Sequence, residues 1–148
     1  MIPDKLQPGD EVRVIAPARS ASDIDKGVLE RAKSALESLG LKVSFSKNAF
    51  SRNQRGCPTD DEKVEDLHEA FMDENVKCVL AAIGGFNSNQ MLGKINWQII
   101  KDSPKIFGGF SDITVLSHAI LAKTGLVTYA MPNFYCFGLP PEANYSLE

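Results

Sequence analysis

Cysteines, histidines and long apolar runs are scarce in this sequence of 148 residues. The three cysteines, Cys57, Cys78 and Cys136, are widely spaced with no C-x-x-C pair, which argues against a disulfide framework and against a zinc site. No stretch approaches the roughly 20 apolar residues that span a bilayer. The first residues, MIPDKLQPGDEVRVIAP, lack the basic start and apolar run of a signal peptide. We therefore expect no metal site, no membrane contact and a cytoplasmic location.

Basic stripes and phosphate-binding loops are missing as well. The formal net charge is -3, and Lys and Arg are interspersed with Asp and Glu, so no basic surface is expected for a nucleic-acid backbone. The chain has no G-x-G-x-x-G motif, and no Walker A lysine follows its glycine pairs. From these absences we expect no nucleic-acid partner and no nucleotide cofactor.

Strand and helix patterns alternate along the chain. The run KCVLAAI at 77–83 is apolar on both parities, which is typical of a strand buried on both faces of a parallel sheet. The alternation predicts an α/β fold with an open, mostly parallel sheet and helices on both faces, a flavodoxin-like or class I glutamine amidotransferase-like three-layer sandwich. Strands are expected at 12–16, 41–45, 77–83, 105–108 and 126–129, and helices at 24–39, 60–73, 88–92 and 112–123.

Helix ends and the tail divide the chain further. Ser22 with Asp25, and Thr59 with Glu62, have the spacing of a capping box, and Gly40 is a predicted helix stop. A chain of this length is expected to bury one core. The proline-rich and aromatic tail has neither period, so we assign 1–135 to one N-terminal domain and 136–148 to the start of a linker toward a C-terminal domain outside this chain.

Two predicted strands end in glycine pairs, at 84–85 and 108–109. Ligands gather at the carboxyl ends of parallel strands, glycine permits close backbone approach, and a helix N-terminus offers N–H groups to negative charge. Ser111 follows the second pair in a half-matched G-x-S-x-G motif, because Ile113 replaces the last glycine. From these residues alone, Ser111 is either a helix N-cap or a nucleophile.

A nucleophilic serine needs a general base, and the chain has only two histidines. His118 lies seven positions after Ser111 on the same predicted helix, about 10.5 Å along its axis. His68 lies beside the apolar stripe of the 60–73 helix, which favours a packing role. If Ser111 is a nucleophile, its base lies outside this chain. The alternative is a non-catalytic module that binds a small carboxylate or phosphate at the glycine turns.

Four segments together resemble a known family: VRVIAPA, VEDLHEAFMDENVKCVLAAIGGFNSNQML, PKIFGGFSDITVL and KTGLVTYAMPNF. The chain is similar, from about residue 11 to 140, to the LD-carboxypeptidase family of serine peptidases, and within it to the branch of the microcin C self-immunity protein. The ordered pair of GG-x-NSN and G-x-SD motifs carries the resemblance. One departure is Ala130-Met131, where family members tend to have a glycine beside the proline.

The resemblance implies a two-domain serine hydrolase of Ser-Glu-His type. Ser111 would be the nucleophile, the backbone N–H groups of Gly85 and Asp112 would form the oxyanion hole, and a C-terminal domain would supply the Glu and the His. The isolated chain is therefore expected to be inactive. The implied substrate-binding residues are Gly84, Phe86, Asn87 and Ser88.

The implied reaction is hydrolysis of an amide bond near the C-terminal end of a small peptide or peptidyl-nucleotide, without a cofactor. Members of the cell-wall branch remove the terminal D-alanine of muropeptides during peptidoglycan recycling, whereas the immunity branch cleaves aspartyl or glutamyl groups from nucleotide-like moieties. The run Asn87, Ser88, Asn89 resembles the immunity branch more; from the residues alone, these side chains bind a ligand or cap the next helix. The resemblance also implies a homodimer.

Overall fold

A computed structural model describes residues 1–143 and confirms the predicted three-layer α/β sandwich. Its five strands form one parallel sheet in the order β2-β1-β3-β4-β5. The strands are β1 (Glu11–Ile15), β2 (Lys42–Phe45), β3 (Val76–Ala81), β4 (Ile106–Gly109) and β5 (Tyr129–Ala130). The α-helices are α1 (Lys26–Ser38), α2 (Asp60–Met72), α3 (Trp97–Asp102) and α4 (Ile113–Thr124). The 3-10 helices are η1 (Ala21–Asp23), η2 (Ser88–Lys94), η3 (Phe134–Gly138) and η4 (Pro141–Ala143).

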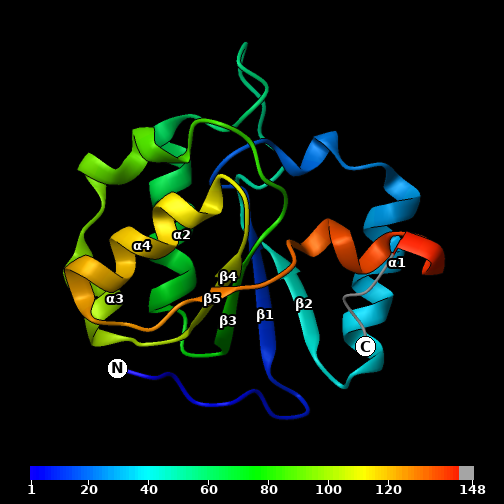
Figure 1. The fold of residues 1–148 in the computed structure, drawn as a ribbon, viewed down its shortest axis with the longest axis horizontal. Coiled ribbons are helices and arrows are strands. Elements are labelled where there is room, and N and C mark those ends of the chain that lie inside the picture. The colour runs from blue at the N-terminus through cyan, green and yellow to red at the C-terminus, as the bar shows by residue number, and fades with distance from the viewer. Residues whose placement is uncertain (144–148) are drawn as a thin grey trace.

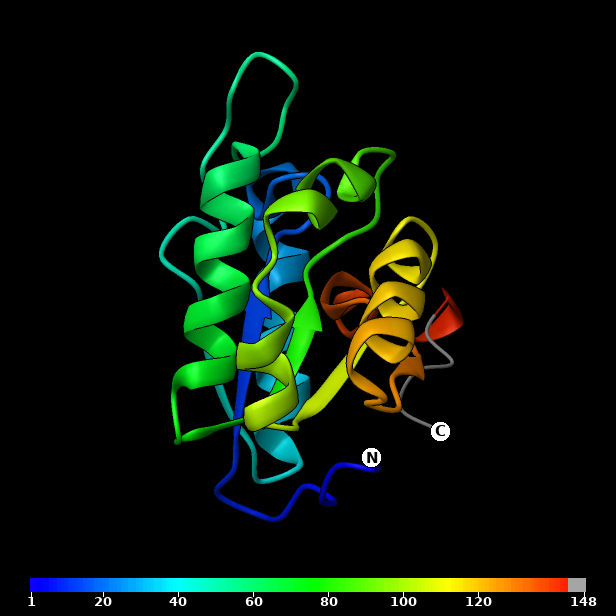
Figure 2. The same ribbon diagram turned by 90° about the vertical axis from the view of Figure 1, so that its left-hand side faces the viewer.

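The helices divide between the two faces of the sheet. Figures 1 and 2 show α1 and η3 on one side, and α2, α3 and α4 on the other. Each side has its own buried apolar cluster, and β3 contributes to both, with Val79 in one and Leu80 in the other. This is why the sequence of β3 is apolar on both parities. No helix formed by residues 1–143 has both the length and the apolar character to cross a bilayer.

Of the two predicted capping boxes, one is confirmed and the other is wrong. At α2, the Thr59 hydroxyl accepts from the Glu62 N–H at 3.2 Å and the Glu62 carboxylate accepts from the Thr59 N–H at 2.7 Å, a complete capping box. At α1, Asp25 is itself the N-cap and accepts from the N–H groups of the first turn. Ser22 is not part of that cap, because it lies in η1, where its N–H donates to Ser20.

The last strand begins later than predicted. A strand was expected at 126–129, but β5 covers only Tyr129–Ala130, which pairs with the end of β4. The residues before it are bonded elsewhere: the Leu126 N–H donates to the Thr124 hydroxyl, and the Val127 N–H donates to the Met1 carbonyl. Of the predicted strand residues, Leu126 is buried in the core, whereas Val127 and Tyr129 are exposed.

The described part of the aromatic tail packs against α1 and does not extend away from the domain. Phe134 and Phe137 are buried in the cluster beneath α1. Gly138 lies directly against this helix, since a Cβ there would be 1.9 Å from the Val28 carbonyl oxygen, and its own carbonyl accepts from Arg31 Nε at 2.9 Å. The beginning of the segment assigned to a linker is thus part of the layer formed by α1, and the assignment of a domain boundary at 135 stays a prediction.

A buried carboxylate joins α2 to the loop after β2. Asp66 is 3% exposed, and its oxygens accept from the backbone N–H of Asn48 at 3.1 Å and from Asn48 Nδ2 at 2.8 Å. Burial raises the pKa of Asp66 to about 6, although the bonds from Asn48 favour the charged form. The folded chain therefore holds a proton on Asp66 more tightly than the unfolded chain, whose aspartates have a pKa of about 3.9.

We predict that Asp66 makes the chain more stable as the pH falls. Between about pH 6 and pH 4 the folded state binds more protons at Asp66 than the unfolded state, so the Asp66 contribution to the free energy of unfolding rises as pH falls. Asp66→Asn removes this contribution. Urea unfolding at several pH values should show a stability difference between the two chains that changes across this window. Asp61→Asn, an exposed carboxylate on α2, is the control, and a pH-independent difference for Asp66→Asn contradicts the assignment.

Candidate active site

A cleft of about 680 Å³ opens at the carboxyl ends of the central strands. β3 and β4 are direct neighbours, and Gly108–Gly109 forms the end of β4. The Gly84 turn after β3 lies beside Ser111, since a Cβ on Gly84 would be 3.3 Å from Ser111 Cβ. The Gly84–Phe86 turn and Ser111 both line the cleft, which confirms that the chain brings these predicted site residues together. The other lining residues are Arg19, Ile83, Phe110, Asn133 and Tyr135.

Ser111 occupies a strained turn between β4 and α4. Its φ is 64°, in the left-handed region that side chains other than glycine rarely adopt, and it is the one non-glycine residue in 1–143 with a positive φ. The residue is exposed. A Cβ on Gly109 would lie 2.7 Å from Ile113 Cγ2, so the first glycine of the motif is sterically required. Ile113, the first residue of α4, is fully buried and its side chain packs in the core, so this position of the motif needs no glycine.

Asp112 ties the two glycine turns together. Its Oδ2 accepts from the backbone N–H groups of Asn87 at 3.0 Å and Ser88 at 2.9 Å, and its own carbonyl accepts from the Ser88 hydroxyl at 2.9 Å. Asp112 holds the N-cap position of α4 but makes no side-chain cap bond there. Its carboxylate is used instead to fix the loop after β3 against the serine turn, through charge-assisted bonds.

Unpaired backbone donors lie on both turns. Within residues 1–143, neither the N–H of Gly85 nor that of Asp112 has a hydrogen-bond partner. A Cβ on Gly85 would lie 3.0 Å from Ala18 Cβ and 3.1 Å from the Arg19 backbone nitrogen, so a side chain there would crowd the loop after β1. The two donors predicted for the oxyanion hole are therefore available for an external acceptor.

The side chains of Asn87 and Ser88 point into the protein. Asn87 is 4% exposed; its Oδ1 accepts from the buried Lys63 ammonium at 3.2 Å, and its Nδ2 donates to Cys57 Sγ at 3.1 Å. Asn87 precedes η2 but makes no side-chain cap bond, so the alternative that its side chain caps this helix is wrong. Both residues follow the Gly84–Phe86 turn directly, and their buried side chains lie on its inner side. Their direct contact with a substrate stays a prediction.

Asn133 is a cleft residue that the sequence analysis missed. It is 1% exposed, and its Oδ1 accepts from the backbone N–H of Phe110, the residue before the serine, at 3.1 Å. It stands three residues after the end of β5, at the carboxyl edge where polar residues gather around ligands. That edge rule could have identified it, but Asn133 lies in the proline-rich and aromatic tail, whose sequence has no strand or helix period that would place it.

No histidine and no carboxylate lines the cleft in the described part of the chain. His68 Nε2 accepts from the Asn96 N–H at 2.9 Å, and burial lowers the pKa of His68, which fits the packing role predicted for it. His118 is exposed on α4. Burial also raises the pKa of Tyr135, which keeps this phenol neutral. The described residues around Ser111 in the cleft therefore include no histidine and no carboxylate.

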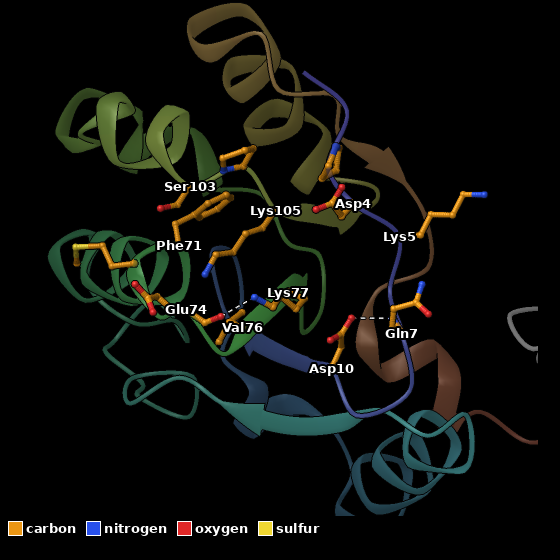
Figure 3. Close-up of a pocket in the computed structure, with 13 residues that line it drawn as sticks. Asp4, Lys5, Gln7, Asp10, Phe71, Glu74, Val76, Lys77, Ser103 and Lys105 are labelled. Carbon is orange, nitrogen blue, oxygen red and sulfur yellow. Dashed lines mark hydrogen bonds between the residues drawn. The ribbon is translucent and has the colours of Figure 1, made fainter.

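A second cavity, of about 520 Å³, lies at the opposite, amino-terminal edge of the sheet (Figure 3). Lys105 extends into it, and its ammonium donates to the backbone carbonyls of Ala70, at 3.1 Å, and Asp73. Lys77 Nζ donates to the Glu74 carbonyl at 2.7 Å, as Figure 3 also shows. Both lysines thus bond the carbonyls at the end of α2, a stabilising role at a helix C-terminus. The Ser111 cleft is the candidate active site.

The curated relatives of this chain include two murein carboxypeptidases and a microcin self-immunity protein. A probable murein peptide carboxypeptidase of Bacillus subtilis is 46% identical over 88% of the chain and 40% of its own length. A murein tetrapeptide carboxypeptidase of Pseudomonas aeruginosa is 34% identical over 91% and 43%. The microcin C7 self-immunity protein of Escherichia coli is 30% identical over 86% and 37%. The chain thus spans less than half the length of the relatives it matches.

Solved structures agree with the sequence relatives. A microcin self-immunity-like protein from Bacillus anthracis str. Ames superimposes with a TM-score of 0.94 at 44% identity, over 95% of this chain and 43% of that one. The microcin C7 self-immunity protein in complex with aspartyl sulfamoyl adenosine gives 0.89 at 29%, over 95% and 42%. The family described as LD-carboxypeptidase N-terminal domain matches residues 12–131. The chain therefore belongs to the LD-carboxypeptidase family, as the four sequence segments indicated.

Proposed function

We propose that this chain is the nucleophile-bearing half of a serine carboxypeptidase, with Ser111 as the attacking group. The observation that carries the proposal is the left-handed φ of 64° at Ser111, at the mouth of a cleft. A residue held there costs on the order of 1–3 kcal/mol, and such strain gathers at functional sites. A serine that served only as an N-cap would have extended backbone angles, and its hydroxyl would bond a free N–H of α4.

The geometry supports an acyl transfer with a named group for each event. Ser111 Oγ attacks the carbonyl carbon of the scissile amide, and its proton passes to a base supplied by a C-terminal domain. The carbonyl oxygen gains the negative charge and accepts from the free N–H groups of Gly85 and Asp112. The amine then leaves with the proton held by that base, and water hydrolyses the acyl-enzyme.

The proposed base lies on a second domain, as a histidine oriented by a glutamate. Two observations support this division: the cleft has no histidine or carboxylate from residues 1–143, and the chain spans 37–43% of its three curated relatives. It follows that the 148-residue chain alone does not turn over substrate. A homodimer of the full-length protein and a cytoplasmic location belong to the same proposal.

The proposed substrate is a small peptide or peptidyl-nucleotide with an amide bond near its C-terminal end. The names of two relatives refer to murein peptides, and a similar solved protein holds aspartyl sulfamoyl adenosine. Arg19 supplies the cation among the described residues that line the cleft, and its side chain is 47% exposed despite its ion pair with Asp23. An anionic group on the substrate suits this guanidinium.

We predict that Ser111→Gly stabilises the chain relative to Ser111→Ala. Both variants lose the hydroxyl, but only glycine adopts φ 64° without a Cβ penalty, so the free energy of unfolding should be higher for Ser111→Gly by about 1 kcal/mol. Urea unfolding of the two variants measures the difference. Equal stability, or a more stable alanine variant, would show that the turn is not strained.

We predict that Ser111→Ala abolishes turnover in a longer polypeptide that joins this domain to its C-terminal partner. Chromatography of a muropeptide tetrapeptide and of aspartyl sulfamoyl adenosine, incubated with the protein, measures hydrolysis. The expected loss is about 10⁶-fold, as for removal of a catalytic serine elsewhere. Ser103→Ala, at the opposite edge of the sheet, is the control and should retain full activity. Ligand binding without hydrolysis in the unsubstituted protein would favour the non-catalytic module instead.

A further inference from the structure

Asn133 presents a buried donor without a partner beside Ser111. Three buried side-chain polar atoms in the described chain lack a hydrogen bond, namely Ser46 Oγ, Ser117 Oγ and Asn133 Nδ2, and of these residues only Asn133 lines the cleft. A buried, unsatisfied donor is destabilising, so native proteins rarely retain one without a role for it. The proposed function above does not use Asn133.

The orientation of the Asn133 amide is fixed by its neighbours. The backbone N–H of Phe110 can only donate, so the atom that it contacts at 3.1 Å must be the amide oxygen, and the NH₂ group must face the other way. The Asn133 carbonyl accepts from the Cys136 N–H at 3.0 Å, which anchors its backbone at the start of η3. Asn133 is therefore fixed both at its backbone and at its amide oxygen.

The NH₂ group and the serine hydroxyl flank one point above Gly84. A Cβ on Gly84 would lie 3.4 Å from Ser111 Oγ and 3.8 Å from Asn133 Nδ2. Because residue 84 is a glycine, this space is open and no side chain separates the two polar atoms. They are not hydrogen-bonded in the structure, but Ser111 is exposed and its hydroxyl is free to turn about χ1.

We propose that Asn133 is a positioning residue for Ser111. Its Oδ1 holds the Phe110 N–H and so fixes the turn before the serine, while its Nδ2 donates a hydrogen bond to Ser111 Oγ. A hydroxyl carries one proton and two lone pairs, so a bond accepted from Asn133 directs the proton away from Asn133 and toward the base. The effect on turnover rests on the proposed function, but the hydrogen bond itself does not.

The hydrogen bond is tested by NMR on the ¹⁵N-labelled 148-residue chain, which needs no activity. In Ser111→Ala the acceptor is gone, so the Asn133 side-chain amide signals should move upfield and exchange faster with water. The side-chain amide of Asn87, which contacts Lys63 and Cys57, is the internal control and should stay in place. Unchanged Asn133 signals would overturn the proposal, whatever the protein hydrolyses.

The positioning role is tested by kinetics on the longer polypeptide. Asn133→Asp keeps the acceptor for Phe110 but loses the donor, and Asn133→Leu has similar volume and neither group. Both should lower kcat about 10- to 100-fold with KM within about twofold, since one hydrogen bond to the reacting atom is lost. Asn75→Asp, at the amino-terminal edge of the sheet, should retain activity and controls for the added charge.

The outcomes separate the donor from a purely structural role. Full activity of Asn133→Asp would mean that the acceptor alone suffices, and full activity of Asn133→Leu would mean that the loss in Asn133→Asp came from charge; either result overturns the proposal. Thermal unfolding of both variants checks that each is folded at the assay temperature, so that a loss of turnover reports on the site. An inactive unsubstituted protein contradicts the proposed function and leaves the NMR result to decide the hydrogen bond.

Discussion

The parallel pairing of β3 with β4 is the constraint on which the site depends. Leu80 lies opposite Gly108 in this pairing, so the loops after both strands begin at the same height on the sheet. One carboxylate, that of Asp112, then reaches two backbone N–H groups across the gap. The sheet thus brings the turns together, and Asp112 fixes the distance between them. The serine turn contains the hydroxyl and the Asp112 N–H, whereas the Gly85 N–H belongs to the turn after β3.

Packing around the serine turn maintains the strained backbone. Ile113, immediately after Asp112, is fully buried and leaves no room for a Cβ on Gly109. Asn133 holds the N–H of Phe110 on the other side of the serine. A left-handed residue persists only where its surroundings determine the backbone so closely. The second glycine of G-x-S-x-G is dispensable here, since the core accepts an isoleucine at that position.

Local patterns in the sequence predicted the elements where local physics decides them. The apolar run at 77–83 and the Thr59 capping box needed no knowledge of the rest of the chain, and both are observed. One error reflects a distant residue, because the Val127 N–H donates to the Met1 carbonyl. The other is local, because Ser22 lies in η1 and is therefore not part of the cap of α1. The fold class was predictable because it follows from the order of the elements, whereas the ends of β5 depend on tertiary hydrogen bonds.

The same distinction applies to the site. The position of Ser111 after a glycine pair is a local feature, so the sequence indicated it, and the family resemblance predicted its role as the nucleophile. Asn133 follows the next strand, 22 residues after Ser111, and no sequence pattern around it indicates a contact with the serine. Its relation to Ser111 arises only when β4 and β5 pair and place both carboxyl ends on one edge. A donor that follows a neighbouring strand is held in place relative to Ser111 because the sheet's hydrogen bonds connect the two strands. In the proposed function, the position of a base on a second domain depends instead on how the two domains pack. The groups whose positions are fixed within one domain are therefore those at the edge of this sheet.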